Sequence, residues 1–158
     1  MVQLTIHLDK SQFQHFDDST VKNIEDKGLK YVGQDLLRNL QINSPVDTGH
    51  LRKWFFKSRG SSMIDIRSPA IYGVFVNDGT GVYGPNGQVI RPKNGKYLVF
   101  KPGPKWKGRV TQSGKWKGYV ALRYSKGQKG QKFVEKSMEQ TEQKLESLFI
   151  SAVRDVLS

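Results

Sequence analysis

The triplet Asp47-Thr48-Gly49 is the first candidate for chemistry, because aspartic proteases carry the same three residues at their catalytic carboxylate. That chemistry needs two carboxylates close enough to share one proton. The chain has one copy, so two chains would have to pair, and Pro45 and His50 stand where flanking apolar strand residues are expected. The alternative is a turn in which Asp47 accepts backbone N–H groups ahead of a short helical turn. We expect the turn, and no enzymatic activity.

The other residues able to carry chemistry form no recognisable site. His7, His15 and His50 lack the four-residue spacing that puts two metal ligands on one face of a helix. The glycines from Gly79 to Gly87 suggest a phosphate-binding loop, but the sequence Gly-x-x-x-x-Gly-Lys-Ser/Thr and a following helix pattern are missing. The chain has no cysteine, which excludes disulfides and cysteine-ligated metals. We expect no cofactor and no metal.

The positive charge of the chain is concentrated in one central segment. The chain has 158 residues and a formal net charge of +12, and residues 79–134 contain 13 Lys and Arg but no Asp or Glu. The rest of the chain contains 13 basic and 14 acidic residues, so the excess belongs to that segment. Such a field attracts phosphate backbones or acidic protein surfaces. The alternative is a set of solvated loops whose lysines protect strand edges from aggregation.

Two similar stretches lie inside this basic segment. Residues 105–110 (Lys-Trp-Lys-Gly-Arg-Val) and 115–120 (Lys-Trp-Lys-Gly-Tyr-Val) flank a turn sequence at residues 111–114, which predicts a β-hairpin with matching arms. Nucleic-acid-binding proteins combine a positive groove with aromatic platforms, but a half-buried hairpin has the same composition. The candidate residues for docking or DNA contact are Lys105, Trp106, Lys107, Arg109, Lys115, Trp116, Lys117 and Arg123. Nucleic-acid binding through residues 79–134 is therefore an alternative function.

The N-terminal part of the chain predicts a strand followed by a long helix. Residues 1–8 alternate apolar and polar side chains, which is typical of a strand. Candidate N-cap residues at 17–20 precede an apolar stripe at helical spacing over residues 21–40. Ser44-Pro45 ends this helix, because the residue before a proline is pushed out of helical geometry.

Short strands are predicted in the middle of the chain. Residues 54–58 and 63–67 have the composition of two strands, and residues 59–62 between them are typical of a hairpin turn. Residues 70–76 are apolar, but the run is too short for its periodicity to assign a helix or a strand. Residues 97–100 predict a further strand in a region rich in Gly, Pro and Lys.

The pattern as a whole predicts one α+β domain over residues 1–158. A second long amphipathic helix begins near Phe133, so a small, mostly antiparallel sheet would pack with two long helices. Residues 82–129 would form a basic loop or hairpin insertion. No stretch approaches the roughly 20 apolar residues of a membrane span, and the N-terminus lacks the pattern of a signal peptide. We expect a soluble protein without membrane contact.

Three blocks of the sequence resemble a known family. Residues 44–52 (Ser-Pro-Val-Asp-Thr-Gly-His-Leu-Arg) follow the long helix, residues 72–81 come next, and residues 130–134 (Gly-Gln-Lys-Phe-Val) open the last helix. Their order and spacing resemble the tail-component family of siphophages, also called tail-completion or neck proteins, over roughly residues 20–157. The chain departs from the family pattern at Asn77-Asp78, at Lys132 and in its longer basic stretch.

The resemblance implies a structural virion protein without catalysis, which forms one subunit of a ring that completes the tail and helps join it to the head. Its partners would be other tail and neck proteins and further copies of itself. Contact with packaged DNA is a further expectation. It would lie in the virion neck, and in the host cytoplasm during assembly.

The resemblance also implies roles for particular residues. Asp47, Thr48 and Gly49 would form a structural corner between helix and sheet. Gly79 and Gly81 would permit a tight loop after Val76. The basic stretch would face either the acidic rim of a neighbouring ring or DNA in the channel.

Overall fold

The computed structural model describes residues 2–5, 15–58, 63–103 and 106–158. Its chain divides into two compact units: Met1–Gly73 together with Lys132–Ser158, and Val74–Gln131. The described residues form four α-helices and two small antiparallel sheets. The fold is therefore α+β, as the sequence predicts, but its strands form two separate sheets and not one.

Helix α1 (Asp18–Asn43) is the centre of the first unit. At its start the Asp17 carboxylate accepts hydrogen bonds from the Thr20 backbone N–H, at 2.9 Å, and from the Ser19 and Thr20 hydroxyls. The carboxylate therefore satisfies donors that the first helical turn leaves free. At its end the Ser44 N–H donates to the Leu40 carbonyl at 3.0 Å, and Pro45 follows. Both ends of the helix lie where the sequence predicts them.

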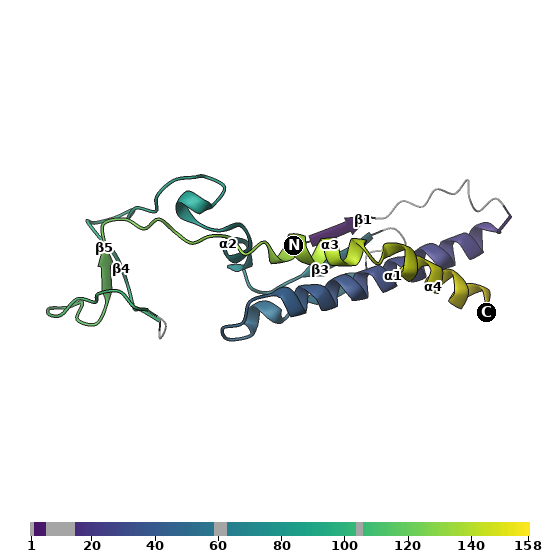
Figure 1. The fold of residues 1–158 in the computed structure, drawn as a ribbon, viewed down its shortest axis with the longest axis horizontal. Coiled ribbons are helices and arrows are strands. Elements are labelled where there is room, and N and C mark those ends of the chain that lie inside the picture. The colour runs from purple at the N-terminus through teal and green to yellow at the C-terminus, as the bar shows by residue number, and fades with distance from the viewer. Residues whose placement is uncertain (1, 6–14, 59–62, 104–105) are drawn as a thin grey trace. The chain divides into compact units, whose positions relative to one another are not determined.

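A three-stranded antiparallel sheet lies along α1 (Figure 1). Its strands are β1 (Val2–Thr5), β2 (Phe55–Ser58) and β3 (Met63–Arg67), in the order β1-β3-β2. Ile64 and Ile66 of the central strand are fully buried. The two strands predicted between residues 54 and 67 and their antiparallel pairing are confirmed, while the predicted turn at residues 59–62 lies outside the described residues, as do residues 1 and 6–8 of the predicted first strand.

Two glycines let α1 pack closely on both sides. A Cβ at Gly28 would overlap the ring of Phe149, which belongs to helix α4 (Leu145–Leu157). A Cβ at Gly33 would lie 2.6 Å from Cδ1 of Ile64 in the sheet. Any larger side chain at either position would force neighbours apart, because protein interiors are close-packed. The core of the first unit therefore forms where the sheet and α4 each contact α1.

The predicted single C-terminal helix is broken into α3 (Phe133–Glu142) and α4, and this part of the prediction is wrong. Between them the Lys144 N–H donates to the Thr141 carbonyl at 3.0 Å, which closes a tighter turn than an α-helix has. The Lys144 side chain bonds to the Asp35 carboxylate of α1 at 3.0 Å. The helix therefore breaks where Lys144 contacts α1, and the periodicity of the sequence does not show such a tertiary contact.

A polar seam joins α1 to α3 through Asp35, Asn39 and Asn43, which recur every four residues on one face of α1. The Asn39 amide donates to the Asp35 carboxylate at 2.8 Å and to the Thr141 hydroxyl at 2.9 Å. The Asn43 amide donates to Ser137 at 3.0 Å. Asn39, Ser137 and Thr141 are buried, so these bonds fix how the two helices align.

We predict that Asn39→Ala destabilises the first unit by about 1–3 kcal/mol, because it removes two hydrogen bonds and leaves their partners without them. The measurement is the free energy of unfolding from urea titration. Asn23→Ala is the matched control, because Asn23 is an exposed residue of the same helix. Equal destabilisation by the two changes would show that the seam adds nothing.

A second prediction concerns the N-cap of α1. The hydrogen bonds from Ser19 and Thr20 hold the pKa of Asp17 well below its usual range. A carboxyl whose pKa is lower in the folded state stabilises the protein above its unfolded pKa of about 4, and this stabilisation is lost as the pH falls through the folded value. Asp17→Ala should therefore lower Tm at pH 7 and lower it less at pH 2. A Tm difference that stays constant between these pH values would contradict this assignment.

Candidate assembly surface

The residues after α1 form a corner that leads into the sheet. Gly49 has a φ of +77°, which favours glycine, and a 3₁₀ turn (His50–Arg52) follows it. Leu51 is buried, and the Arg52 Nε donates to the Ser44 carbonyl at 3.2 Å. Gly49 thus allows the chain to reverse sharply where α1 ends.

The sequence analysis missed the residue pair that fastens this corner. The Trp54 Nε1 donates to the Ser44 hydroxyl at 2.8 Å, and that hydroxyl donates to the Leu40 carbonyl at 2.6 Å. The Trp54 ring also meets Phe133, the first residue of α3, edge to face at 6.4 Å. Three elements therefore meet at one tryptophan. The signal in the sequence was a Trp close to the Ser-Pro that ends a helix.

Asp47 does not have the capping role that the sequence suggests. The position before the 3₁₀ turn belongs to Gly49, and no described residue forms a hydrogen bond with the Asp47 side chain. Asp47 and Thr48 are both exposed. The prediction of an Asp47 cap is wrong, because Thr48 and Gly49 separate the carboxylate from the start of the turn.

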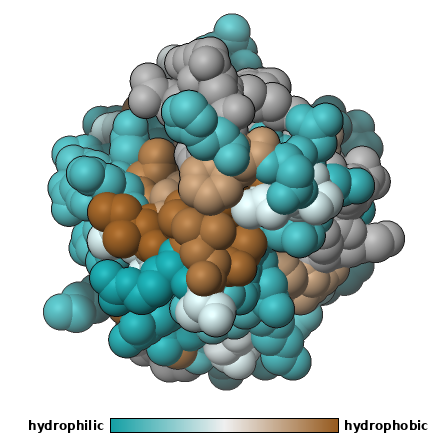
Figure 2. Space-filling view, turned by 90° about the vertical axis from the view of Figure 1, so that its right-hand side faces the viewer, coloured by the Kyte–Doolittle hydropathy of each residue, from teal (hydrophilic) through white to brown (hydrophobic). Residues whose placement is uncertain are grey.

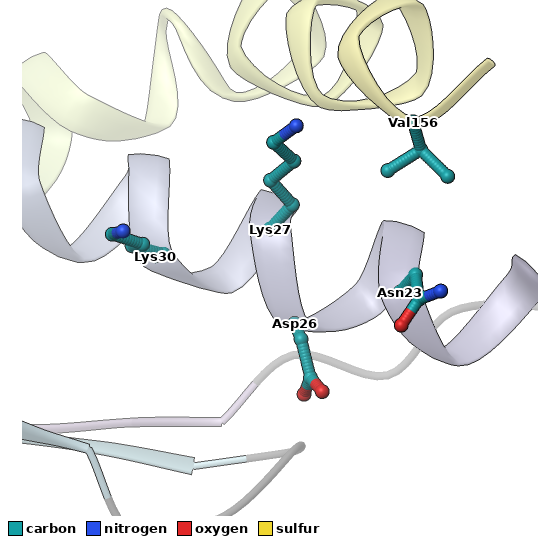
Figure 3. Close-up of a pocket in the computed structure, with 5 residues that line it drawn as sticks. All are labelled: Asn23, Asp26, Lys27, Lys30 and Val156. Carbon is teal, nitrogen blue, oxygen red and sulfur yellow. The ribbon is translucent and has the colours of Figure 1, made fainter. Parts of the chain in front are cut away.

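A shallow furrow of about 440 Å³ lies in the first unit, between α1 and the end of α4. Figure 3 shows that its side chains do not converge: Lys27 points toward α4, whereas Asp26 points away from it. The Lys27 Nζ donates to the Asp155 backbone carbonyl at 2.9 Å, and Tyr31 donates to the Asp155 carboxylate, which raises the pKa of Tyr31. These groups join two helices and leave no set of side chains aimed at a ligand.

Over the described ranges, no three His, Asp or Glu side chains lie close enough to hold a metal ion. No helix in the same ranges is both long and apolar enough to span a bilayer.

A clasp between residues 79–82 and residues 126–130 closes the second unit. The Thr80 and Val82 N–H groups donate to the carbonyls of Gln128 and Lys126, both at 2.9 Å. Gly79 pairs with Lys129 as an isolated bridge, next to helix α2 (Gly73–Asp78) and a 3₁₀ turn (Gly81–Tyr83). The clasp brings together two segments that lie almost 50 residues apart in the sequence.

Gly81 and Gly127 allow the two backbone segments of the clasp to approach each other closely. Gly81 has a φ of +66° and Gly127 a φ of +83°, and a Cβ on either would overlap backbone atoms of the opposite segment. Gly79 has a φ of +87° and faces the Gly130 backbone. The predicted turn at residues 79–81 is therefore present, and it follows α2, which ends at Asp78.

The strands of the second unit do not pair as the repeated sequence predicts. Strand β4 (Leu98–Phe100) pairs with β5 (Val120–Leu122), and described residues 106–119 contain no strand. The described residues of the two tryptophan stretches are loops, and the second is closed against the segment before it where the Gly118 N–H donates to the Thr111 carbonyl at 2.9 Å. The prediction of matching hairpin arms is wrong. Glycines at 108, 114 and 118 weaken an extended conformation there.

Each tryptophan of these loops is held by a neighbouring ring. Trp106 meets Phe100 edge to face at 5.7 Å, and Trp116 meets Tyr119 in the same way at 5.6 Å. The Lys115 Nζ lies 5.4 Å from the centre of the Trp116 ring. Trp106 and Trp116 nevertheless remain 40% and 45% exposed.

The second unit buries almost none of its apolar side chains. Among its described residues, Val120 is the single buried hydrophobic residue. Eleven large apolar side chains are exposed: Val74, Phe75, Val82, Tyr83, Ile90, Tyr97, Val99, Phe100, Trp106, Trp116 and Tyr124. One buried valine contributes roughly 1.5–3 kcal/mol, which is little against the entropy lost in ordering a unit of this size.

The basic residues of the second unit are exposed as well. Between Val74 and Gln131 there are twelve Lys and Arg and one acidic residue, Asp78. Of the predicted contact residues, Trp106, Lys107, Arg109, Lys115, Trp116, Lys117 and Arg123 are all exposed, and Lys105 lies outside the described residues. The structure assigns all of these described residues to the same compact unit.

The first unit has an exposed apolar area of its own on the last helix. Ile150 and Leu157, on α4, are 51% and 52% exposed. Figure 2 looks onto the end of the first unit where α4 finishes, and hydrophobic side chains gather there in a patch edged by hydrophilic ones. Contiguous apolar patches of this kind mark surfaces that contact other molecules.

Comparison of the chain with protein families, with curated proteins and with solved structures found no match.

We predict that Gly127→Ala opens the clasp. The new Cβ would overlap the Thr80 backbone, and the positive φ alone costs about 1–2 kcal/mol for a residue with a side chain. Amide hydrogen exchange should show lost protection at Thr80 and Val82. Gly87→Ala is the matched control, because Gly87 has a φ of +60° but nothing within 4 Å of its Cβ position. Equal loss of protection in both variants would refute a steric role for Gly127.

Proposed function

We propose that this chain is a structural virion protein of a tailed phage. In this proposal it completes the end of the tail and helps join tail to head as one subunit of a ring. Its task is to present surfaces to neighbouring subunits and to other tail and neck proteins, and it carries out no reaction.

The observation that carries the proposal is the exposed apolar surface of the second unit. Eleven large apolar side chains are exposed there and one hydrophobic side chain is buried, among the described residues. Burial of these side chains against a neighbouring subunit would supply the hydrophobic contribution that the unit by itself lacks. Tyr, Trp and Phe are the residue types enriched at the centres of protein interfaces.

The positions of the three blocks that resemble the tail-completion family also support the proposal. Residues 44–52 form the corner after α1, residues 79–81 form one side of the clasp, and Phe133 of the third block starts α3. Each block therefore lies at a junction between elements, where a change of residue would alter the fold. Residues that fix junctions are what a scaffold requires.

The first unit suits a scaffold for subunit contacts. Helix α1 packs against the sheet and against both C-terminal helices, and the polar seam fixes the alignment of α1 with α3. Such a frame holds its exposed residues, Ile150 and Leu157 among them, in constant positions. A ring needs this constancy because every copy must repeat the same contacts.

The proposal predicts that phage particles cannot be completed without this chain. Deletion of its gene from the phage or prophage that encodes it should leave separate filled heads and tails, visible by electron microscopy, and should abolish infectivity. Expression of the chain in trans should restore both. Infectious particles assembled in the absence of the chain would refute the proposal.

A pair of double variants tests whether the exposed apolar side chains of the second unit are needed for head–tail joining. Tyr97→Asp with Tyr124→Asp adds two charges at half-exposed aromatic positions and should prevent complementation. Asn86→Asp with Asn94→Asp adds the same number of charges at exposed polar positions of the same unit and should complement normally. Normal complementation by the tyrosine variant would remove the apolar surface of the second unit from the contact.

A further inference from the structure

We infer that the β4–β5 part of the second unit, residues 98–103 and 106–123, binds the phosphate backbone of duplex DNA without reading its sequence. The inference names a partner for the basic unit and rests on the proposed function for its setting, since a joint between head and tail surrounds the path of the genome. The DNA-binding surface consists of Lys101, Lys107, Arg109, Lys115, Lys117 and Arg123, with the two tryptophan loops that carry most of them.

The first argument is that the positive charge of the DNA-binding surface is not balanced by nearby acidic side chains among the described residues. All six basic side chains of the DNA-binding surface are exposed, and none forms an ion pair with a described acidic residue. The one acidic residue of the unit, Asp78, is bonded to Asn77. Copies of this unit in a ring would repel one another unless a polyanion lay among them. Phosphates supply that charge and release condensed counterions on binding.

The second argument is the kind of cation present. Four of the six basic residues of the DNA-binding surface are lysines, and lysine is depleted at interfaces between proteins. Lysine and arginine are the side chains that neutralise nucleic-acid phosphates. The composition therefore favours a phosphate backbone over the acidic rim of another protein.

The third argument separates backbone binding from base stacking. A tryptophan that stacks on bases must offer a free ring face. Trp116 has Lys115 over its ring and Tyr119 at its edge, while Trp106 meets Phe100 and lies so close to Gly108 that a Cβ there would be 2.6 Å from the indole. These contacts hold each ring against its own loop, and the part of each ring that stays exposed, 40% for Trp106 and 45% for Trp116, is what the competition experiment below tests for base stacking. This arrangement suits a duplex, whose bases are already stacked.

The test measures binding of the purified full chain to two fluorescent duplexes of about 30 base pairs with unrelated sequences, by anisotropy, between 50 and 200 mM salt. With about six phosphate contacts, affinity should fall roughly thousandfold over this range and should be equal for both sequences. In the variant Lys101→Gln, Lys107→Gln, Lys115→Gln, Lys117→Gln the slope of log affinity against log salt should decrease by as much as about 3.6.

The matched control replaces four exposed lysines of the first unit: Lys22→Gln, Lys30→Gln, Lys53→Gln, Lys136→Gln. It changes the net charge by the same amount. We expect its slope of log affinity against log salt to differ by less than about 1 from the slope of the unaltered chain. Equal losses in the two variants would overturn the inference, because binding would then follow net charge alone. Circular dichroism of both variants establishes that they are folded.

Two competitors decide between ligand classes. A single-stranded oligonucleotide that competes better than the duplex would overturn backbone binding in favour of base stacking, and polyglutamate that competes better than either would favour an acidic protein. The failure of the inference and the failure of the proposed function are distinguishable. An unaltered chain that does not bind duplex DNA but still supports head–tail joining refutes only the inference, whereas infectious particles that assemble without the chain refute the proposed function.

Discussion

Close packing on both sides of α1 is the constraint on which the rest of the structure depends. Gly28 admits a ring of α4 and Gly33 admits the side chains of the sheet, so one helix organises two layers around itself. Thirteen of the fourteen buried hydrophobic residues among those described belong to this unit. The hydrophobic contribution to stability, which scales with buried apolar area, is therefore almost entirely local to it.

The second unit is held together by different forces. Backbone hydrogen bonds across the clasp, a short β4–β5 ladder and a few ring contacts hold it, with very little apolar burial among its described residues. Such bonds contribute about 0.5–1.5 kcal/mol each and exchange with water when they open. The stability of the second unit therefore rests on hydrogen bonds and ring contacts that water reaches, whereas that of the first unit rests on buried apolar area. In the proposed assembly, a partner that covered the exposed aromatic side chains would add the missing apolar burial.

The sequence predicted those elements whose signal is local. The caps of α1, the Pro45 boundary and the β2–β3 hairpin follow from residues a few positions apart. It could not show the break at Lys144, where the side chain pairs with Asp35 more than 100 positions away, or the pairing of Leu98–Phe100 with Val120–Leu122. The resemblance between the two tryptophan stretches misled the hairpin prediction, because similar loops were mistaken for paired strands. The candidate contact residues were chosen from the charge pattern of the sequence alone, and their contact with a partner stays a prediction.

The clasp has a consequence for how the chain can change over time. The Gln131 N–H donates to the Val76 carbonyl at 3.0 Å, so the backbone leaves the second unit beside the point at which it entered. Whatever lies between these two residues is closed at both ends by the same few bonds. The entropy of closing such a loop rises only slowly with its length. Substitution, lengthening or exchange of the intervening stretch therefore costs the frame little, and variants with new binding preferences can arise while the core stays as it is.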